Sequence, residues 1–415
     1  MTRLIHTADW HLGARLIDCD RHEEHAAFLE WLLQQLAALR PDLLIVAGDI
    51  FDGATPPQEA LKLYYHFLSR LAQVARCQTL VLGGNHDSPA TLHAPREVLR
   101  ALDVRVIAAP PENPADALIS LPDAIICAVP YLRERDVRTA SPGQSADEVA
   151  AAIRTGIKNH YRAVYELAQA TAAGRLIIGT GHLTALGSAI SPSERTIHIG
   201  NLGAVSGDCF DGFAYTALGH IHRPQPVGGN ERVRYAGSPI ALSFAEVDLA
   251  KEIRVIDING PTLTHHAIPL PVFRSLIRLT TNGAALGADL ATVLTHLRAG
   301  PNEPPLIPWL ELTVTDGRSH PDLARRVSAA AAELPLRILK VMTPAALTLG
   351  DDSDLAAPTR ALSDFRPEDV FTERLRCEQI PTDSAEAKTL SETFSELLSG
   401  LHESVDFTTP SQGAP

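Results

Sequence analysis

The chain opens with Leu4-Ile5-His6-Thr7-Ala8-Asp9-Trp10-His11, an apolar β-type run that ends in a polar Asp-x-His sequence. Four later apolar runs end in the same way, with residues of metal-ligand type directly after them: Gly48-Asp49 after 43–47, Gly84-Asn85-His86-Asp87 after 79–82, Gly181-His182 after 176–178, and Gly219-His220-Ile221-His222 after 215–218. In open α/β sheets, ligands usually bind at the carboxyl ends of the strands. The five runs therefore predict one site that is built from five strand ends.

The segments between these runs have the pattern of helices. Helices are expected at 21–39 and 57–75, and in the second one apolar residues recur with the 3.6-residue period of a half-buried helix. These residues are Leu61, Tyr64, Tyr65, Leu68 and Leu71. Further β-type runs follow at 124–129, 233–235 and 253–258. The alternation predicts a many-stranded α/β domain over residues 1–269.

Pro269 and Pro271 mark a break, after which a second, smaller domain is expected at 272–345. Its pattern is β-α-β-α-β, with the elements expected at 276–279, 286–297, 309–314, 323–334 and 337–341. Between Val272 and Met342 the net charge is +2, which makes this the least acidic part of the chain and is weakly indicative of DNA contact.

Residues 351–403 are expected to form a helical segment, with helices near 368–377 and 385–401. One face of the second helix is apolar: Leu390, Phe394, Leu397, Leu398 and Leu401. So small a segment cannot bury that face alone, so a partner or the main body must cover it. Residues 404–415 are polar and are expected to be a disordered tail.

Composition excludes several classes of protein. The 415 residues, 45% of them hydrophobic, suffice for two or three folded domains. The longest apolar runs are far shorter than the ~20 residues of a membrane span, and the pattern of a signal peptide is missing, so no membrane association and a cytoplasmic location are expected. The five scattered cysteines have neither zinc-finger nor disulfide spacing. A net charge of −13, carried mainly by residues 351–415, argues against a chain that coats nucleic acid.

The strand-end residues offer two carboxylates, one amide oxygen and four imidazoles: Asp9, Asp49, Asn85, His11, His182, His220 and His222. Oxygen and nitrogen donors without thiolates suit manganese, iron or zinc. One ion rarely needs seven ligands, whereas two ions about 3.5–4 Å apart that share a carboxylate use them naturally, and such pairs hydrolyse phosphate esters. Two divalent ions and two carboxylates leave a local charge of +2, which would attract a phosphodiester despite the acidic chain.

The five motifs resemble those of the calcineurin-like metallophosphoesterases. Four longer strings resemble one branch of that superfamily, the SbcD-type nuclease subunits: 6–13, 48–52, 217–223 and 235–244. The resemblance implies an α/β fold in which a two-sheet αββα metallophosphoesterase sandwich precedes a small α+β capping domain and a C-terminal helical segment that docks a partner.

The resemblance also implies roles for the site residues. Asp9, His11, Asp49 and His222 would hold one manganese ion, and Asp49, Asn85, His182 and His220 would hold the other, with Asp49 as the bridge; Mg²⁺ or another divalent ion is the alternative. His86 would position the phosphate and aid the leaving oxygen, and Asp87 would orient His86 by a hydrogen bond. Some relatives carry a further histidine three residues after the bridge, where this chain has Asp52, for which only a local hydrogen-bond acceptor role is expected.

The implied activity is 3′ to 5′ exonuclease cleavage of duplex DNA ends and endonuclease cleavage of hairpins or single strands, by a homodimer within a heterotetramer. The partner would be an SbcC-type coiled-coil ATPase that docks near 366–375. This chain has no Gly-x-x-x-x-Gly-Lys-Ser/Thr string, so we expect it to bind no nucleotide itself. The alternatives are a phosphodiesterase for small molecules or cyclic nucleotides, and a non-catalytic scaffold for DNA ends.

Overall fold

The computed structural model describes residues 1–75, 77–138, 144–189, 204–298 and 304–343, together with residues 371, 375, 384, 387–391, 393 and 394. The chain forms two compact units, Met1–Ala345 and Ala346–Pro415. Within the described residues, no helix is both long enough and apolar enough to cross a membrane.

A six-stranded sheet contains the first three ligand-bearing strands. Its order is β14 (Thr262–Pro269), β13 (Glu252–Asn259), β1 (Thr2–Thr7), β4 (Leu43–Ala47), β5 (Gln78–Leu82) and β6 (Val104–Ile107). Strands β1, β4, β5 and β6 are parallel, whereas β13 and β14 run antiparallel to their neighbours. Strand β4 has an uninterrupted apolar sequence because both of its faces are buried. The parallel order places the carboxyl ends of β1, β4 and β5 side by side.

A second six-stranded sheet contains the other two ligand-bearing strands. Its order is β11 (Gln225–Val227), β12 (Asn230–Tyr235), β10 (Tyr215–Gly219), β9 (Leu176–His182), β8 (Ala124–Cys127) and β7 (Leu118–Ser120). Strands β12, β10, β9 and β8 are parallel. Apolar side chains of both sheets form a common core, with Leu4 and Ile45 from the first and Ile126 and Ile178 from the second.

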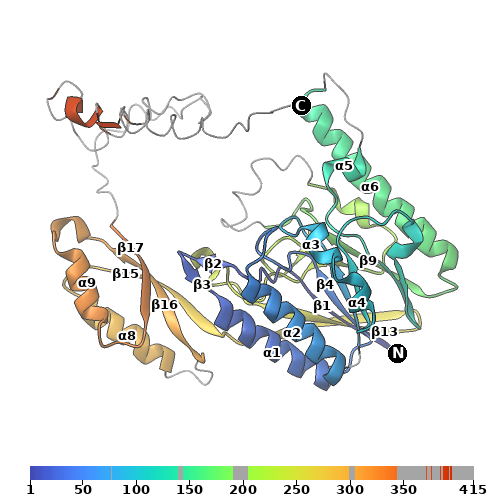
Figure 1. The fold of residues 1–415 in the computed structure, drawn as a ribbon, viewed down its shortest axis with the longest axis horizontal. Coiled ribbons are helices and arrows are strands. Elements are labelled where there is room, and N and C mark those ends of the chain that lie inside the picture. Colours follow the sequence, from blue (N-terminus) through green and yellow to red (C-terminus); the bar gives the residue numbers. More distant parts are fainter. Residues whose placement is uncertain are drawn as a thin grey trace, which may run out of the picture. The chain divides into compact units, whose positions relative to one another are not determined.

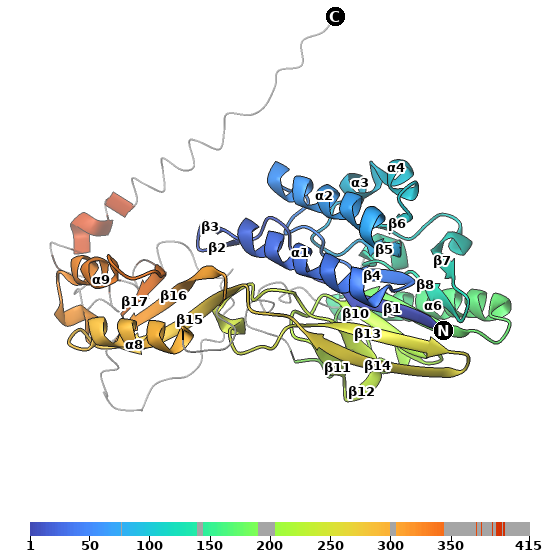
Figure 2. The same cartoon turned by 90° about the horizontal axis from the view of Figure 1, so that it is seen from below.

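Helices cover the outer faces of the two sheets. Helices α1 (His22–Leu39) and α2 (Gln58–Val74) lie side by side against the first sheet (Figures 1 and 2). Helix α6 (Ala146–Thr171) packs against the second sheet. The remaining short elements are β2 (Arg15–Leu16), β3 (Cys19–Asp20), α3 (Pro89–His93), α4 (Arg96–Arg100), η1 (Pro114–Ala117), α5 (Glu134–Val137), η3 (Gly207–Phe210) and η4 (Phe244–Glu246). The predicted αββα sandwich is confirmed.

The predicted β-α-β-α-β order after residue 272 is also found. Its elements are β15 (Arg274–Thr281), α8 (Leu286–Arg298), β16 (Leu306–Val314), η5 (Gly317–Ser319), α9 (Leu323–Ala331) and β17 (Arg337–Met342). The three strands form a parallel sheet in the order β15-β16-β17. Leu290 and Val327 of the two helices pack on Leu310 and Leu312 of the central strand, so this part of the chain has a core of its own.

Most of the C-terminal segment lies outside the described residues. Of the helices expected at 368–377 and 385–401, only residues 371, 375, 387–391, 393 and 394 are described, and these are helical; the tail expected at 404–415 lies wholly outside the described residues. Among the described residues of the second unit, the rings of Phe371 and Phe394 stack with their centroids 4.2 Å apart, and the side chains of Leu375 and Ala387 are buried.

Candidate metal centre

Backbone hydrogen bonds join the loops that follow β1 and β4, and three residues of these loops have an uncommon backbone conformation. Asp9, His11 and Asp49 have positive φ angles of 53°, 46° and 49°, which are uncommon for residues other than glycine and tend to occur at functional sites. The N–H of Asp9 donates to the carbonyl of Gly48, and the N–H of His11 donates to the carbonyl of Asp49, both at 3.0 Å. These bonds fix the three polar side chains at one edge of the first sheet.

Glycine is needed at positions 48 and 84, because the side chains of His182 and Asp49 occupy the space that a Cβ atom would need. A Cβ atom at Gly84 would lie 2.1 Å from Oδ1 of Asp49, and one at Gly48 would lie 2.2 Å from Nδ1 of His182. Gly48 also has a φ of 89°, a conformation that side chains disfavour. A larger residue at either position would displace the carboxylate or the imidazole.

The side chains of Asp9, His11 and Asp49 form one half of the site. All three are buried, and their potential ligand atoms lie within 4.8 Å of one another. The imidazole ring of His222 lies 5.1 Å from that of His11. Oδ1 of Asp9 accepts a hydrogen bond from the N–H of His220 at 2.7 Å, whereas Oδ2 of Asp9 and Nε2 of His11 are buried without a hydrogen-bond partner among the described residues. Buried polar atoms without partners are costly, and a cation would satisfy both.

Asp49, His182 and His220 form the other half, with Asn85 between the two imidazoles. Nδ1 of His182 donates to the carbonyl oxygen of Ala47 at 2.9 Å, so a neutral ring has no hydrogen on Nε2. That Nε2 atom lies 3.0 Å from Oδ1 of Asn85 and 3.2 Å from Oδ2 of Asp49. Lone pairs that face one another in this way repel unless a proton or a metal ion lies between them, so the donor set fits a divalent cation.

The electrostatics of the buried residues also favour a cation. Burial acts to lower the pKa of His182, but the carboxylates of Asp49 and Asp9 outweigh it and raise the pKa to about 9. Burial likewise lowers the pKa of His11, and the neighbouring Asp52, Asp49 and Asp9 raise it to about 9. Burial would raise the pKa of Asp49, yet the surrounding imidazoles hold it far below its ordinary value. The carboxylate of Asp49 is therefore ionised at neutral pH.

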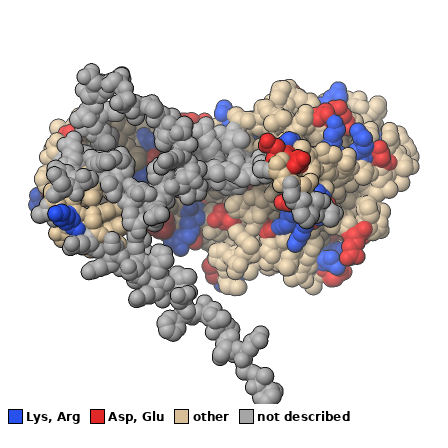
Figure 3. Space-filling view, turned by 90° about the horizontal axis from the view of Figure 1, so that it is seen from above, with Lys and Arg blue, Asp and Glu red and all other residues tan. Residues whose placement is uncertain are grey.

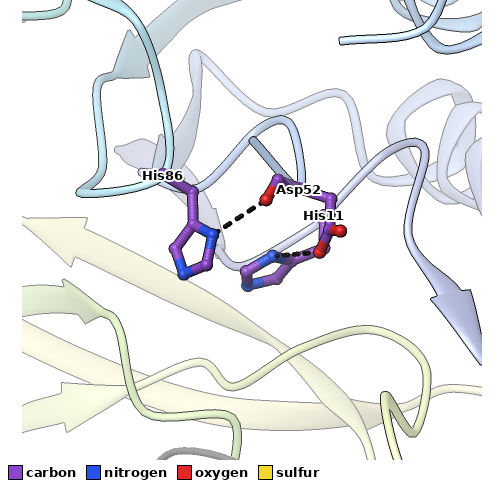
Figure 4. Close-up of side chains that lie close together, drawn as sticks. All are labelled: His11, Asp52 and His86. Carbon is purple, nitrogen blue, oxygen red and sulfur yellow. Dashed lines mark hydrogen bonds and ion pairs between the residues drawn. The ribbon is translucent and has the colours of Figure 1, made fainter. Parts of the chain in front are cut away.

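His86 lies at the rim of this centre, in contact with Asp52 (Figure 4). Its Nδ1 lies 2.8 Å from the backbone carbonyl oxygen of Asp52, so Nδ1 carries a hydrogen, and its backbone N–H donates to Oδ1 of Asp49 at 3.0 Å. The carboxylate of Asp52 lies 3.2 Å from Nδ1 of His11. Asp52 is thus a hydrogen-bond acceptor, as expected. It contacts two histidines, His86 through its backbone carbonyl and His11 through its carboxylate.

The structure corrects the expected role of Asp87. Its buried carboxylate accepts hydrogen bonds from three backbone N–H groups, those of Gly84 at 2.8 Å, Phe51 at 3.0 Å and Ile50 at 3.1 Å. The partner of the His86 ring is the carbonyl of Asp52 instead. Burial and the charge of Asp49 raise the pKa of Asp87 to about 6. Asp87 therefore connects the loops after β4 and β5 and acts on their backbones, because its carboxylate points toward them.

Sequence reasoning missed one residue of the site, Glu246. Its carboxylate, which is 0% exposed, lies 3.2 Å from Nδ1 of His222. Glu246 follows no strand and belongs to the short turn η4, 24 positions further along the chain, so no local pattern joins it to His222.

Comparisons with known proteins identify the family of the chain. A family profile described as Calcineurin-like phosphoesterase matches residues 2–127, and one described as Type 5 capsule protein repressor C-terminal domain matches residues 272–379. The SbcD subunit of the nuclease SbcCD of Escherichia coli strain K12 is 35% identical over 413 residues, which cover 97% of this chain and 100% of that protein. The SbcD subunit of Rhodobacter capsulatus is 36% identical, and the match covers 89% of this chain and 93% of that protein. The SbcD subunit of Bacillus subtilis is 29% identical, and the match covers 66% of this chain and 71% of that protein.

The first of these relatives matches 97% of this chain, and the phosphoesterase profile covers the loops that carry Asp9, His11, Asp49 and Asn85. The chain belongs to the SbcD family of metal-dependent nuclease subunits, within the calcineurin-like phosphoesterases.

Proposed function

We propose that the chain hydrolyses phosphodiester bonds of DNA with two divalent ions, manganese being the expected metal, as the nuclease subunit of an SbcCD-type complex. The observation that carries this proposal is the convergence of five strand ends from two sheets on one set of carboxylate, amide and imidazole donors, which are buried except for the half-buried Asn85. The relatives named as SbcD subunits of the nuclease SbcCD support the choice of DNA as substrate.

In the proposed assignment, Asp49 is shared by both ions. Asp9, His11 and His222 complete one ligand set, and Asn85, His182 and His220 complete the other. Two of the three groups whose potential ligand atoms lie within 4.8 Å of one another, Asp9-His11-Asp49 and Asp49-His182-His220, support this division. When bound, the ions would activate a water molecule and stabilise the charge that develops on the phosphate.

His86 is the proposed catalytic residue outside the ligand sets. Because Nδ1 donates to the carbonyl of Asp52, Nε2 is the ring atom left to face the substrate. In its protonated form His86 would hydrogen-bond the phosphate through Nε2 and transfer that proton to the departing 3′ oxygen, which leaves a 5′ phosphate on the product. Proton transfer of this kind typically contributes about 10²–10⁴-fold to a rate.

DNA would be held mainly at the metal centre. On the part of the face in Figure 3 that is not drawn in grey, basic and acidic side chains are interspersed. We propose that residues 1–269 form the nuclease domain, that 272–345 form a capping domain that helps to hold DNA, and that 351–403 dock a coiled-coil ATPase. ATP dependence, 3′ to 5′ polarity, cleavage of hairpins and homodimerisation are part of the same proposal by resemblance to the family.

The test uses the full chain with manganese and end-labelled linear duplex and hairpin DNA, with and without an ATPase partner. Asp49→Asn keeps the shape of the side chain but removes the bridging charge, so it also controls for contaminating nucleases. We expect metal-dependent cleavage that is lost in the variant, together with fewer than two manganese ions per chain by elemental analysis. Hydrolysis of a small aryl phosphodiester without cleavage of DNA, even with the partner present, would favour a small-molecule phosphodiesterase.

A further inference from the structure

The short turn η4 (Phe244–Glu246) brings a buried carboxylate to the back of the metal centre. Oε1 of Glu246 lies 3.2 Å from Nδ1 of His222, and both side chains are buried. Because Nδ1 faces a carboxylate, it carries the hydrogen of the ring, and Nε2 keeps the electron pair that can bind a cation. The contact therefore selects both the tautomer of His222 and the atom that it can offer to a metal ion.

Lys251 contacts both His222 and Glu246. Its Nζ lies 2.8 Å from Oε2 of Glu246, 2.8 Å from Oγ of Ser238 and 3.2 Å from the backbone carbonyl oxygen of His222. One ammonium group thus contacts the main chain of His222 and also the carboxylate that contacts its ring. The ammonium group also compensates the charge of Glu246, which is expensive to bury alone.

The position of η4 itself is fixed by packing on its other side. Phe244 is 5% exposed and lies in an apolar cluster with Leu16 and with Trp309 of the capping domain. Oδ2 of Asp248, two residues after the turn, lies 2.6 Å from the guanidinium of Arg278 in β15. The Asp248–Arg278 pair is largely exposed and adds little, but the buried side chain of Phe244 holds this three-residue turn in place, and with it Glu246 beside His222.

We propose that Glu246 and Lys251 are positioning residues for His222, and that they keep its Nε2 directed at one of the two metal ions. This inference rests on the proposed function for its metal ions, because His222 needs a fixed ring only if that ring is a ligand. Hydrogen bonds to the second nitrogen of a metal-binding histidine orient the ring and raise its basicity, and their loss typically weakens metal affinity by about 10–100-fold.

The test measures manganese binding to the full chain by calorimetry. It also measures the ring nitrogens of His222 by NMR in metal-free protein with ¹⁵N-labelled histidine, and His222→Asn identifies the signal. The main variant is Glu246→Leu combined with Lys251→Met, which removes the carboxylate without leaving a buried charge unpaired. Glu246→Gln keeps an acceptor oxygen, and Glu252→Gln on the next strand is the matched control because its carboxylate contacts Arg254 and Arg234.

We expect the double variant to weaken one manganese site by about 10–100-fold and to leave the other within twofold. The ring of His222 should change from the Nδ1–H form to a mixture of tautomers. Glu246→Gln should largely keep the Nδ1–H form, and Glu252→Gln should behave as the parent. A folded double variant with two parent-like sites and an unchanged tautomer would overturn the inference.

If the double variant does not fold, Glu246→Asp takes its place. This change keeps a charge for Lys251 but withdraws the carboxylate from the ring by one CH₂ group, so the same loss of the Nδ1–H form is expected, and an unchanged tautomer counts against the inference. A parent chain that binds no divalent ion would contradict the proposed function instead. The tautomer measurement in metal-free protein would still decide the role of Glu246.

Discussion

Nδ1 of His86 lies 2.8 Å from the backbone carbonyl oxygen of Asp52, which is three residues beyond the proposed bridging ligand Asp49. A carbonyl can only accept a hydrogen bond, so this contact fixes the proton of a neutral ring on Nδ1 and leaves Nε2 toward the reaction centre. A backbone group makes the contact, so the orientation of His86 depends on the loop after β4.

The first prediction concerns His86→Ala. We expect this variant to bind manganese as the parent does, because His86 belongs to neither proposed ligand set. Its single-turnover cleavage rate should fall by about 10²–10⁴-fold, since proton transfer to the leaving oxygen is lost. Elemental analysis and rapid-quench kinetics on the same preparation check both parts. A parent-like rate with full metal occupancy would show that His86 takes no part in the reaction.

The second prediction separates the two contacts of Asp52. Asp52→Ala removes the carboxylate that lies 3.2 Å from Nδ1 of His11 but keeps the backbone carbonyl that contacts His86. We therefore expect manganese affinity to fall by about 10–100-fold while the cleavage rate at saturating manganese stays near that of the parent. Asp52→Asn, which retains an acceptor oxygen, should be milder. A lower rate at saturating metal with unchanged affinity would mean that the side chain acts on His86.

The strands that carry the site could be predicted because their signals are local. In β1, β4 and β5 an apolar run is followed directly by Asp or Asn, and parallel pairing then brings these ends together. Helix α6 was missed, although Ser145 and Glu148 form a capping box at its start, a pattern that the sequence does contain. The edge strands β6, β7, β11 and β14 were also missed, because they are short or half-exposed and carry only a weak pattern.

The positions of the supporting side chains could not be predicted, because they depend on contacts between distant segments. The pattern Asn85-His86-Asp87 gives no indication that the carboxylate of Asp87 turns toward the N–H groups of Ile50 and Phe51. The contact of Glu246 with His222 likewise depends on how the turn η4 packs against Leu16 and Trp309, which lie far from it in the sequence. The sequence therefore identifies the candidate ligand residues, while the orientation of their side chains is known only from the structure.

The third prediction follows from the corrected role of Asp87. In Asp87→Asn one carboxylate oxygen becomes an NH₂ group, which must face a backbone N–H that now has no acceptor. We expect a loss of about 1–3 kcal/mol in the free energy of unfolding, together with weaker manganese binding because the loop of Asp49 loosens. Urea denaturation and calorimetry check these effects, with the exposed Asp116→Asn as control. Parent-like stability with a slower reaction would restore the expected role as a partner of His86.

The fourth prediction concerns His6, a buried histidine of β1 whose ring lies between the two sheets. Its Nε2 donates to the carbonyl of Leu218 at 3.1 Å, and its Nδ1 accepts from the hydroxyl of Tyr215 at 3.3 Å, so both nitrogens are used in the neutral form. Burial, reinforced by the charges of Arg254 and Arg234, lowers the pKa of His6 to about 3. In the unfolded chain the pKa returns to about 6.5.

The neutral ring thus stabilises the fold fully above pH 6.5, and this contribution is lost as the pH falls from 6.5 toward 3, because only the unfolded chain takes up the proton. The slope is at most about 1.4 kcal/mol per pH unit for one such group. His6→Gln can keep both hydrogen bonds without a titrating group. Between pH 7 and 5 the metal-free parent should therefore lose about 2 kcal/mol more stability than the variant, as measured by urea denaturation.

The exposed His66→Gln should show the acid sensitivity of the parent because its ring stays in water in both states. Equal losses in the parent and His6→Gln would mean that His6 is protonated in the folded chain, and the hydrogen bond from Tyr215 would then have to be reassigned.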